Sequence, residues 1–209
     1  LGSFLGGRIR LYPHQLYVAE RATATDPVRW LLADEVGLGK TIEAGLILRE
    51  LMDRGEVDAF SVLCPPHLVE QWIGELKARF GVGAVPVTSG TASRLERGLP
   101  LTQTLFDAYP FTVVSLDYIK AEKRREGFAR SCPDFVIVDE AHACVGTHQG
   151  RQQRFELLSR LARNTERRMI LLTATPHSGD EEAFYRLLSL VDRSFASMDF
   201  EDTRYRERL

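Results

Sequence analysis

Lys40 and Thr41 stand at the end of the glycine-containing run GLGKT, at residues 37–41. Backbone N–H groups at the start of a helix bind phosphate oxygens well, and glycines let the chain approach those oxygens closely. A lysine adds positive charge beside the β- and γ-phosphates of a nucleotide, and a threonine hydroxyl can bind magnesium. The run therefore predicts a phosphate-binding loop, whose candidate residues are Asp34, Glu35, Val36, Gly37, Leu38, Gly39, Lys40 and Thr41.

This loop departs from the general pattern G-x-x-x-x-G-K-[ST] at its first position, where the chain has Asp34. The departure weakens the match to kinases and GTPases. The alternative is a glycine-rich turn that only caps a helix. Such a turn, however, has no need of a lysine followed by a threonine.

Two carboxylates, Asp139 and Glu140, follow the apolar run FVIV at residues 135–138. The run predicts a buried strand, and in open α/β sheets ligands bind at the carboxyl ends of the strands. Asp139 would then hold magnesium, partly through water, and Glu140 would polarise a water for in-line attack on the γ-phosphate. Lys40, Asp139 and Glu140 are therefore the candidate catalytic residues. An acidic pair that only begins a helix is the alternative.

Two threonines, Thr173 and Thr175, follow a third apolar run. Their hydroxyls can link the magnesium site to a second binding site. The alternative is a hydroxyl-containing turn that ends a strand before Pro176.

Two other groups of side chains have weaker functional interpretations. A basic run can contact nucleic-acid phosphates or form an ordinary solvated helix face; its members are Lys120, Lys123, Arg124, Arg125 and Arg130. His142, Cys144 and His148 are of metal-binding types and close in sequence. A zinc site is disfavoured because no fourth ligand has suitable spacing.

Short apolar runs alternate with amphipathic helical patterns, which predicts βα units in an α/β fold with a parallel sheet covered by helices on both faces. The expected strands are Trp30–Ala33, Phe60–Cys64, Ala84–Val87, Phe111–Ser115, Phe135–Val138 and Met169–Thr173. The expected helices are Thr41–Arg54, Leu68–Phe80, Gln152–Leu161 and Glu181–Val191. The expected loops are Gly81–Leu99, Ala121–Pro133 and Cys144–Gly150.

The composition restricts the class of protein. With 209 residues, 44% of them hydrophobic, the chain is long enough for one domain with a sizeable core. We expect that domain to span residues 1–191, with residues 192–209 a charged linker or the start of a further segment. A net charge of −2 excludes a uniformly basic nucleic-acid-binding surface. Three cysteines, no long apolar run and no signal-peptide pattern indicate a cytoplasmic protein without a membrane segment.

The ordered set GLGKT, DEAH and TATP resembles the first RecA-like lobe of superfamily 2 helicases and translocases. The longer run DEVGLGKTIEAGLIL, at residues 34–48, resembles the Swi/Snf-type branch, especially its bacterial RapA-like members. Asp34 is usual at its position in that branch. The resemblance implies a P-loop NTPase fold and an ATP-dependent translocase of double-stranded DNA, with ATP and Mg²⁺ as cofactors.

The same resemblance implies roles for individual residues. Gln15 matches a glutamine that reads the adenine edge of the nucleotide; the alternative is a solvent-exposed glutamine on a helix. His142 matches a residue that couples the nucleotide site to the motif of Thr173 and Thr175. In such enzymes ATP lies between two lobes, and arginines of the second lobe stabilise the transferring phosphoryl group. The chain by itself is therefore expected to be nearly inactive.

Partners also follow from the resemblance. Segments 62–72 and 113–118 match motifs that contact DNA phosphates, which implies duplex DNA in a groove formed by both lobes. RNA polymerase or a phage-defence complex is the implied protein partner. A nucleotide-binding assembly module that does not hydrolyse ATP and a superfamily 2 RNA helicase lobe remain as alternatives. A GTPase is disfavoured because the sequence contains no N-K-x-D guanine signature.

Overall fold

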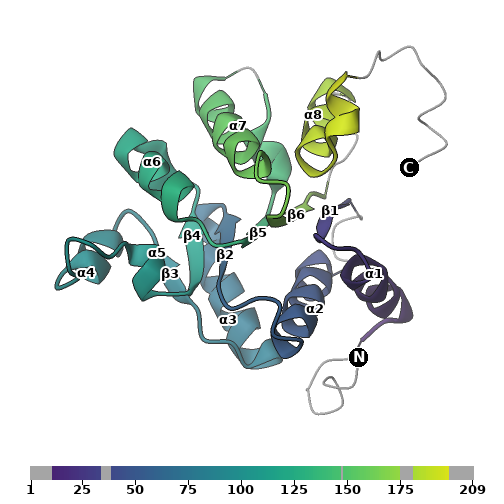
Figure 1. Cartoon of the computed structure of the whole chain (residues 1–209), viewed down its shortest axis with the longest axis horizontal. Coiled ribbons are helices and arrows are strands. Elements are labelled where there is room, and N and C mark those ends of the chain that lie inside the picture. The colour runs from purple at the N-terminus through teal and green to yellow at the C-terminus, as the bar shows by residue number, and fades with distance from the viewer. Residues whose placement is uncertain (1–10, 34–38, 147, 175–180, 198–209) are drawn as a thin grey trace.

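The computed structural model describes residues 11–33, 39–146, 148–174 and 181–197. Within them, parallel strands form one six-stranded sheet in the order β1-β6-β5-β2-β4-β3 (Figure 1). The strands are β1 (Arg29–Leu32), β2 (Phe60–Cys64), β3 (Val85–Val87), β4 (Phe111–Ser115), β5 (Phe135–Val138) and β6 (Arg168–Leu172). Each expected strand is present, with its ends shifted by no more than one residue.

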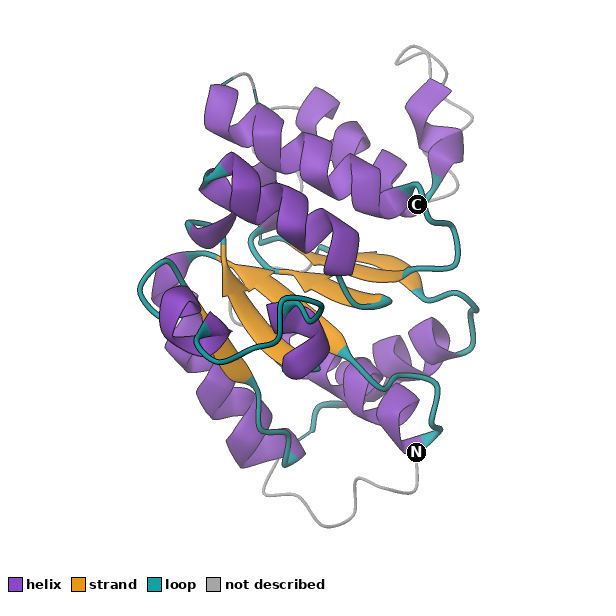
Figure 2. Cartoon of the chain, turned by 60° about the vertical axis from the view of Figure 1, so that its left-hand side comes forward, coloured by secondary structure: helices purple, strands orange, loops and turns teal. Residues whose placement is uncertain are grey.

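Helices cover both faces of this sheet, as Figure 2 shows. One face packs against α1 (Pro13–Thr23), α2 (Lys40–Asp53) and α3 (Val69–Phe80). The other packs against α6 (Glu122–Ser131), α7 (Gln149–Ala162) and α8 (Glu181–Val191), with the short α4 (Ala92–Glu96) and α5 (Leu105–Ala108) toward the β3 edge. The predicted α/β fold with a doubly covered parallel sheet is confirmed.

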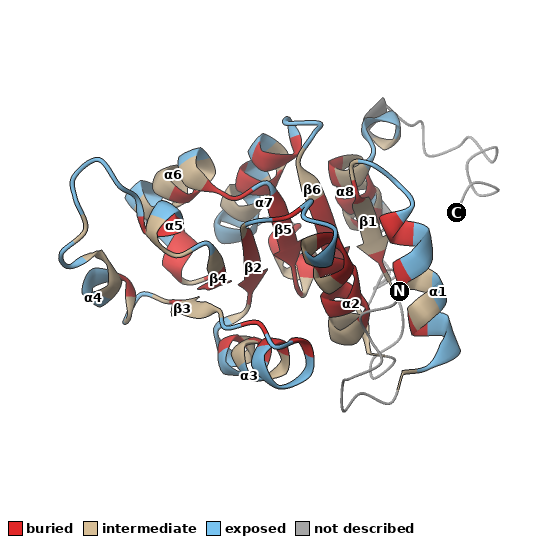
Figure 3. Ribbon diagram, turned by 60° about the horizontal axis from the view of Figure 1, so that its bottom comes forward, coloured by how far each residue is buried: buried red, intermediate tan, exposed pale blue. Residues whose placement is uncertain are grey.

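Neighbouring residues of a strand pack into the hydrophobic cores on opposite faces of the sheet. In β2, Val62 packs on the side of α2 and α3, whereas Leu63 packs on the side of α6 and α7. Every residue of β2 and β5 is buried, and these strands are red in Figure 3. Ser61 is a polar residue in this interior, and its hydroxyl is hydrogen-bonded to that of Thr112 at 2.8 Å. Coverage of both faces explains why these strands are apolar along their length.

Two segments that the sequence predicts as loops contain helices, so those predictions were wrong. The segment 81–99 contains α4, and the segment 121–133 contains α6. Phe128 is the buried residue of α6, so this segment lacks the apolar periodicity that identifies an amphipathic helix. Its Glu, Lys and Arg residues nevertheless have good intrinsic helix propensity. The sequence also assigned no helix to α1 or α5.

Short 3-10 helices connect several elements: η2 (Pro66–Leu68), η3 (Tyr118–Lys120), η4 (Ala141–Cys144) and η5 (Arg193–Ser197). Three of them follow the carboxyl ends of strands β2, β4 and β5. None of the helices in the described ranges is both long and apolar enough to cross a lipid bilayer.

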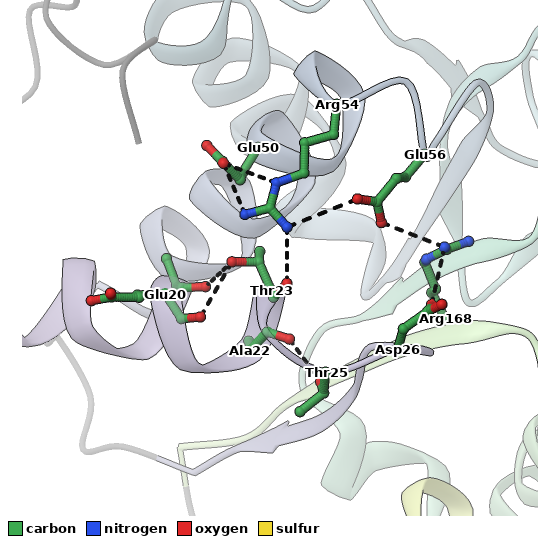
Figure 4. A network of polar contacts seen from close by, with 10 residues as sticks. Glu20, Ala22, Thr23, Thr25, Asp26, Glu50, Arg54, Glu56 and Arg168 are labelled. Atoms are coloured by element: carbon green, nitrogen blue, oxygen red, sulfur yellow. Dashed lines mark hydrogen bonds and ion pairs between the residues drawn. The ribbon is translucent and has the colours of Figure 1, made fainter.

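A polar network joins α1 to α2 and to β6 (Figure 4). Arg54, which follows α2, donates to the carboxylate of Glu50 at 3.0 Å and to the carbonyl of Thr23, at the end of α1, at 2.9 Å. Glu56 lies 3.8 Å from Arg54 and 3.6 Å from Arg168 of β6. Charge-assisted contacts of this kind hold α1 against the helix that follows the predicted phosphate-binding loop.

Candidate nucleotide-binding site

The predicted site residues follow three neighbouring strands. β1 precedes the predicted phosphate-binding loop, β5 ends just before Asp139, and β6 ends just before Thr173. β6 pairs in parallel with β1 on one side and with β5 on the other. Because neighbouring strands lie about 4.8 Å apart, the carboxyl ends of β1 and β5 are separated by roughly 10 Å. Side chains at these ends can therefore contact one nucleoside triphosphate.

Lys40 begins α2, and Gly39 precedes it in the left-handed conformation, with φ 88°. Glycine adopts this conformation without the steric cost that a Cβ brings. The Gly39 carbonyl accepts hydrogen bonds from the N–H groups of Ile42 and Glu43, at 2.8 and 3.0 Å. Lys40 and Thr41 thus lie in the first helical turn, where the helix dipole favours phosphate. The remaining predicted loop residues, Asp34, Glu35, Val36, Gly37 and Leu38, lie outside the described residues.

Gln15, on α1, lies against the start of α2. The residue is 3% exposed, and its Oε1 accepts a hydrogen bond from the backbone N–H of Tyr12 at 3.1 Å. A Cβ atom at Gly39 would lie 2.4 Å from Gln15 Nε2, closer than real Cβ contacts occur. The positive φ angle therefore favours glycine at position 39, and a Cβ there would displace the amide of Gln15. The structure brings Gln15 to the end of the predicted phosphate-binding loop.

Both carboxylate oxygens of Asp139 accept hydrogen bonds from the protein. The backbone N–H of Glu140 donates to Oδ1 at 2.8 Å, and the indole N–H of Trp72 donates to Oδ2 at 2.8 Å. The sequence placed Trp72 within the expected helix Leu68–Phe80 and within the segment 62–72, and it gave no indication of this contact. The available signal was that the N–H group of a buried tryptophan needs an acceptor.

Glu140 has a left-handed backbone conformation, with φ 51°, and is the one non-glycine residue with positive φ among those described. Such conformations are strained and are concentrated at functional sites. His142 Nδ1 lies 3.2 Å from Glu140 Oε2 and 3.2 Å from Thr173 Oγ1. His142 thus connects the residues after β5 with the residue after β6. Thr175 lies outside the described residues.

All three cysteines are buried and form no disulfide. Burial raises the pKa of Cys64 to about 12, and the negative charge of Asp139 adds to the shift. Burial likewise raises the pKa of Cys144 to about 12. Both thiols are therefore protonated at neutral pH. Within the described ranges, no three His, Cys, Asp or Glu residues gather to hold a metal ion.

The predicted basic run is largely engaged in contacts within the lobe. Three of its members are bound to neighbours: Lys120 to Asp117, Arg124 to Glu96, and Arg125 to the backbone carbonyls of Ile119 and Lys120. Lys123 and Arg130, together with Arg124, line a cavity of about 510 Å³ beside α5. Local pairing of these charges favours an ordinary helix face over a continuous phosphate-binding track.

The segments 62–72 and 113–118 lie beside each other. They leave the carboxyl ends of β2 and β4, which are paired in parallel. The N–H of Leu116 donates to the carbonyl of Cys64 at 2.9 Å. Because β2 also pairs with β5, both segments lie on the same edge of the sheet as Asp139.

Comparison with known proteins assigns the chain to a family. The SNF2-related domain matches residues 21–207. The RNA polymerase-associated protein RapA of Actinobacillus pleuropneumoniae serotype 5b (strain L20) is 34% identical over 192 residues, which cover 90% of this chain and 20% of RapA. RapA of Proteus mirabilis (strain HI4320) is 34% identical over 188 residues, which cover 90% of this chain and 19% of that protein. The chain thus spans about a fifth of the length of these relatives.

Solved structures show the same fold. The Sulfolobus solfataricus SWI2/SNF2 ATPase core in complex with dsDNA matches with a TM-score of 0.68 and 16% sequence identity. The match covers 89% of this chain and 36% of the Sulfolobus chain. The Pyrococcus furiosus Hef helicase domain matches with a TM-score of 0.60 and 18% sequence identity. The match covers 87% of this chain and 37% of the Hef chain. The fold is therefore that of one RecA-like lobe of these larger ATPase cores. The SNF2-related domain matches most of the length of this chain, and the chain therefore belongs to the SNF2-related domain family.

Proposed function

We propose that this chain is the ATP-binding lobe of an ATP-dependent double-stranded DNA translocase, which hydrolyses ATP to ADP and phosphate together with a second lobe. One observation carries the proposal: Lys40, the pair Asp139 and Glu140, and Thr173 follow the carboxyl ends of three adjacent parallel strands. Membership of the SNF2-related domain family supports ATP as the nucleotide.

The residues at this edge fit a nucleotide that carries Mg²⁺. Lys40, with the loop of residues 34–41, would hold the phosphates at the start of α2. Thr41 and Asp139 would hold the magnesium ion, Asp139 partly through water, because Mg²⁺ prefers oxygen ligands and needs few of them from the protein. When bound, the ion neutralises charge on the phosphates. Glu140 would orient the attacking water, so Lys40, Asp139 and Glu140 are the proposed catalytic residues.

Gln15 and His142 would connect the nucleotide to the rest of the lobe. A side-chain amide can both donate to and accept from the adenine edge, and the Gln15 amide lies against the end of the phosphate-binding loop. His142, which contacts both Glu140 and Thr173, would transmit the state of the nucleotide to the segment that contains Thr175.

Duplex DNA is the proposed nucleic-acid partner. The similar Sulfolobus core is in complex with dsDNA, and the segments 62–72 and 113–118 lie side by side at the same edge of the sheet. RNA polymerase or a phage-defence complex is the proposed protein partner, since RapA is described as RNA polymerase-associated. The proposed lobe comprises residues 1–191, with residues 192–209 leading out of it, and a cytoplasmic location remains a prediction of the sequence.

ATP turnover tests this proposal. We would measure it in a protein that joins this lobe to a second RecA-like lobe, with duplex DNA, with single-stranded RNA and without nucleic acid. The expected result is ATP hydrolysis that duplex DNA accelerates and that GTP does not replace. Acceleration by RNA alone would identify an RNA helicase instead. ATP binding without turnover under every condition would identify a non-hydrolysing module.

A further inference from the structure

Trp72, at the end of the segment 62–72, contacts the nucleotide-binding edge from α3, and the proposed function gives its indole no role at the magnesium site. It lies in the first turn of α3, is 2% exposed and packs among apolar residues such as Val69 and Leu76. Its indole N–H nevertheless reaches the carboxylate of Asp139 at the end of β5. Packing alone does not account for this choice of residue, because a phenylalanine would supply an aromatic ring without a donor.

The contact restricts how the Asp139 side chain can rotate. One oxygen accepts the backbone N–H of the next residue and the other accepts the indole N–H of Trp72, each at 2.8 Å. Each carboxylate oxygen has two lone pairs, so each keeps one for another partner. With two donors fixed by different elements, the remaining lone pairs point in fixed directions. Asp139 itself is 9% exposed, so water has little access to replace a lost donor.

We propose that Trp72 is a positioning residue for Asp139: its indole N–H holds the carboxylate in the orientation that receives magnesium. This inference rests on the proposed function, in which Asp139 holds the ion. Protein groups that orient a metal ligand typically change metal affinity by 10- to 100-fold when removed. The structure thereby gives α3, which follows directly on the segment leaving β2, a direct chemical link to the magnesium site.

The chain contains a matched control for the loss of one indole donor. Trp30, on β1, also donates its N–H to a side chain, the hydroxyl of Thr25, at 3.1 Å. That contact is exposed and involves no carboxylate. The substitutions Trp72→Phe and Trp30→Phe therefore each remove one indole and one hydrogen bond, and only the first removes a contact to Asp139.

Calorimetric titration with ATP, in magnesium and then in EDTA, tests the proposal on this chain. For Trp72→Phe we expect the Kd for ATP in magnesium to rise by about tenfold or more, and the Kd in EDTA to change less than about twofold. Trp30→Phe should bind like the wild type in both buffers. An unchanged Kd in magnesium for Trp72→Phe would overturn the positioning role, as would an equal loss with and without magnesium, which indicates a structural effect alone.

Nuclear magnetic resonance of the wild-type protein gives a readout that does not depend on the folding of a variant. The indole N–H resonance of Trp72 should shift when ATP is added with magnesium and remain nearly in place when ATP is added with EDTA, while that of Trp30 stays constant. A Trp72 resonance that responds equally in both buffers, or in neither, would contradict the positioning role. If the wild type binds no ATP even with magnesium, both the proposed function and this inference fail. If it binds ATP but the Trp72 resonance does not depend on magnesium, only this inference fails.

Discussion

Asp139 and Glu140 are adjacent in sequence but have different surroundings, and the difference supports different roles. The Asp139 carboxylate accepts two hydrogen bonds from the protein and is almost buried. The Glu140 side chain is 33% exposed and lies near a histidine ring. A carboxylate held by fixed donors suits an ion that must stay in place. A carboxylate that water reaches suits the orientation of a nucleophilic water.

Replacement of Lys40 by alanine tests the phosphate-binding loop. Lys40 lies in the first turn of α2 and is only partly buried, so its loss removes phosphate contacts and little core packing. Since a hydrogen bond to a charged group contributes about 1.5–3 kcal/mol, the Kd for ATP should rise at least about tenfold while the melting temperature stays nearly constant. Calorimetry and thermal melting measure both. Lys77→Ala, at an exposed position of α3, is the control and should bind ATP like the wild type. Unchanged ATP binding by Lys40→Ala would show that this segment is not a phosphate-binding loop.

The second residue-scale prediction concerns Glu140→Gln in a protein that contains both lobes. Glutamine retains the size of the side chain but cannot accept a proton from water, so ATP binding should remain while turnover falls about 100-fold or more. Steady-state hydrolysis and nucleotide binding are measured on the same preparation. Asp139→Asn should instead weaken the magnesium-dependent part of binding. Normal turnover in Glu140→Gln would show that this carboxylate has only a structural role.

At the scale of elements, Arg29 joins β1 to the ends of two helices. Its guanidinium donates to five backbone carbonyls, those of Ala162, Asn164, Arg167, Leu190 and Val191. The first of these ends α7 and the last two end α8, which lie side by side in Figure 1. Cations are favoured at helix carboxyl ends. Burial lowers the pKa of Arg29, and the nearby charges of Arg193 and Arg167 lower it further.

Arg29→Lys should therefore destabilise the lobe although it keeps the charge. An ammonium has three donors and cannot reproduce the planar fork that serves five acceptors, so we expect a loss of about 2–4 kcal/mol in the free energy of unfolding. Urea titration followed by circular dichroism measures it. Arg193→Lys, which removes one exposed hydrogen bond to the carbonyl of Arg163, should cost less than about 1 kcal/mol. Equal effects of the two substitutions would refute this account.

The packing of α2 on α3 leads to a second prediction at this scale. A Cβ at Gly45 would lie 2.3 Å from ring atoms of Phe80, whereas a Cβ at Gly74 would meet nothing within 4 Å. Gly45→Ala should destabilise the lobe by about 1–3 kcal/mol because the ring must move. Gly74→Ala, at an exposed position in the middle of α3, should stabilise it by about 0.5–1 kcal/mol. Urea titration of both variants should give opposite signs; the same sign would contradict the packing explanation.

The elements also show why some of the structure could be predicted from the sequence and some could not. The strands could be predicted because a buried parallel strand is a short, continuous apolar run. The helix α6 could not, because Phe128 is its buried residue and charged residues surround it. Lys40 and Asp139 were recognised by local motifs. The hydrogen bond from Trp72 to Asp139 depends on the tertiary arrangement that brings the start of α3 to the residue after β5, which no local pattern records.

At the scale of the whole molecule, strand order brings the proposed functions together. β1, β6 and β5 carry the residues proposed to bind nucleotide, and β2 and β4 continue the same sheet with the segments proposed to contact DNA. Hydrogen bonds cross between the two halves: the N–H of Asp139 donates to the carbonyl of Leu63 at 2.8 Å, and Trp72 donates to the Asp139 side chain. A shift of Asp139 can therefore move the segment that follows β2, and a shift of that segment can move Asp139, through these two hydrogen bonds.

The same architecture limits what the 209-residue chain can do when it is prepared by itself. It covers 36% of the similar SWI2/SNF2 chain and about a fifth of RapA, and the proposed mechanism needs arginines from a second lobe. An arginine supplied to a transferring phosphoryl group can contribute roughly 10³ to 10⁵ in turnover. We therefore expect the chain to bind ATP but to hydrolyse it scarcely above background.

Duplex DNA should not rescue that activity, because DNA accelerates two-lobe motors by helping the lobes close, and one lobe has no partner to close against. DNA binding should be weak, since few phosphates are neutralised by one side of a groove, and it should decrease as salt is added because the contacts are electrostatic. A steady-state ATPase assay with and without duplex DNA, at several salt concentrations, measures both properties. Robust turnover that rises with DNA and with the square of protein concentration would mean that a second copy supplies the missing arginines. Robust turnover proportional to protein concentration would mean that the two-lobe mechanism is wrong.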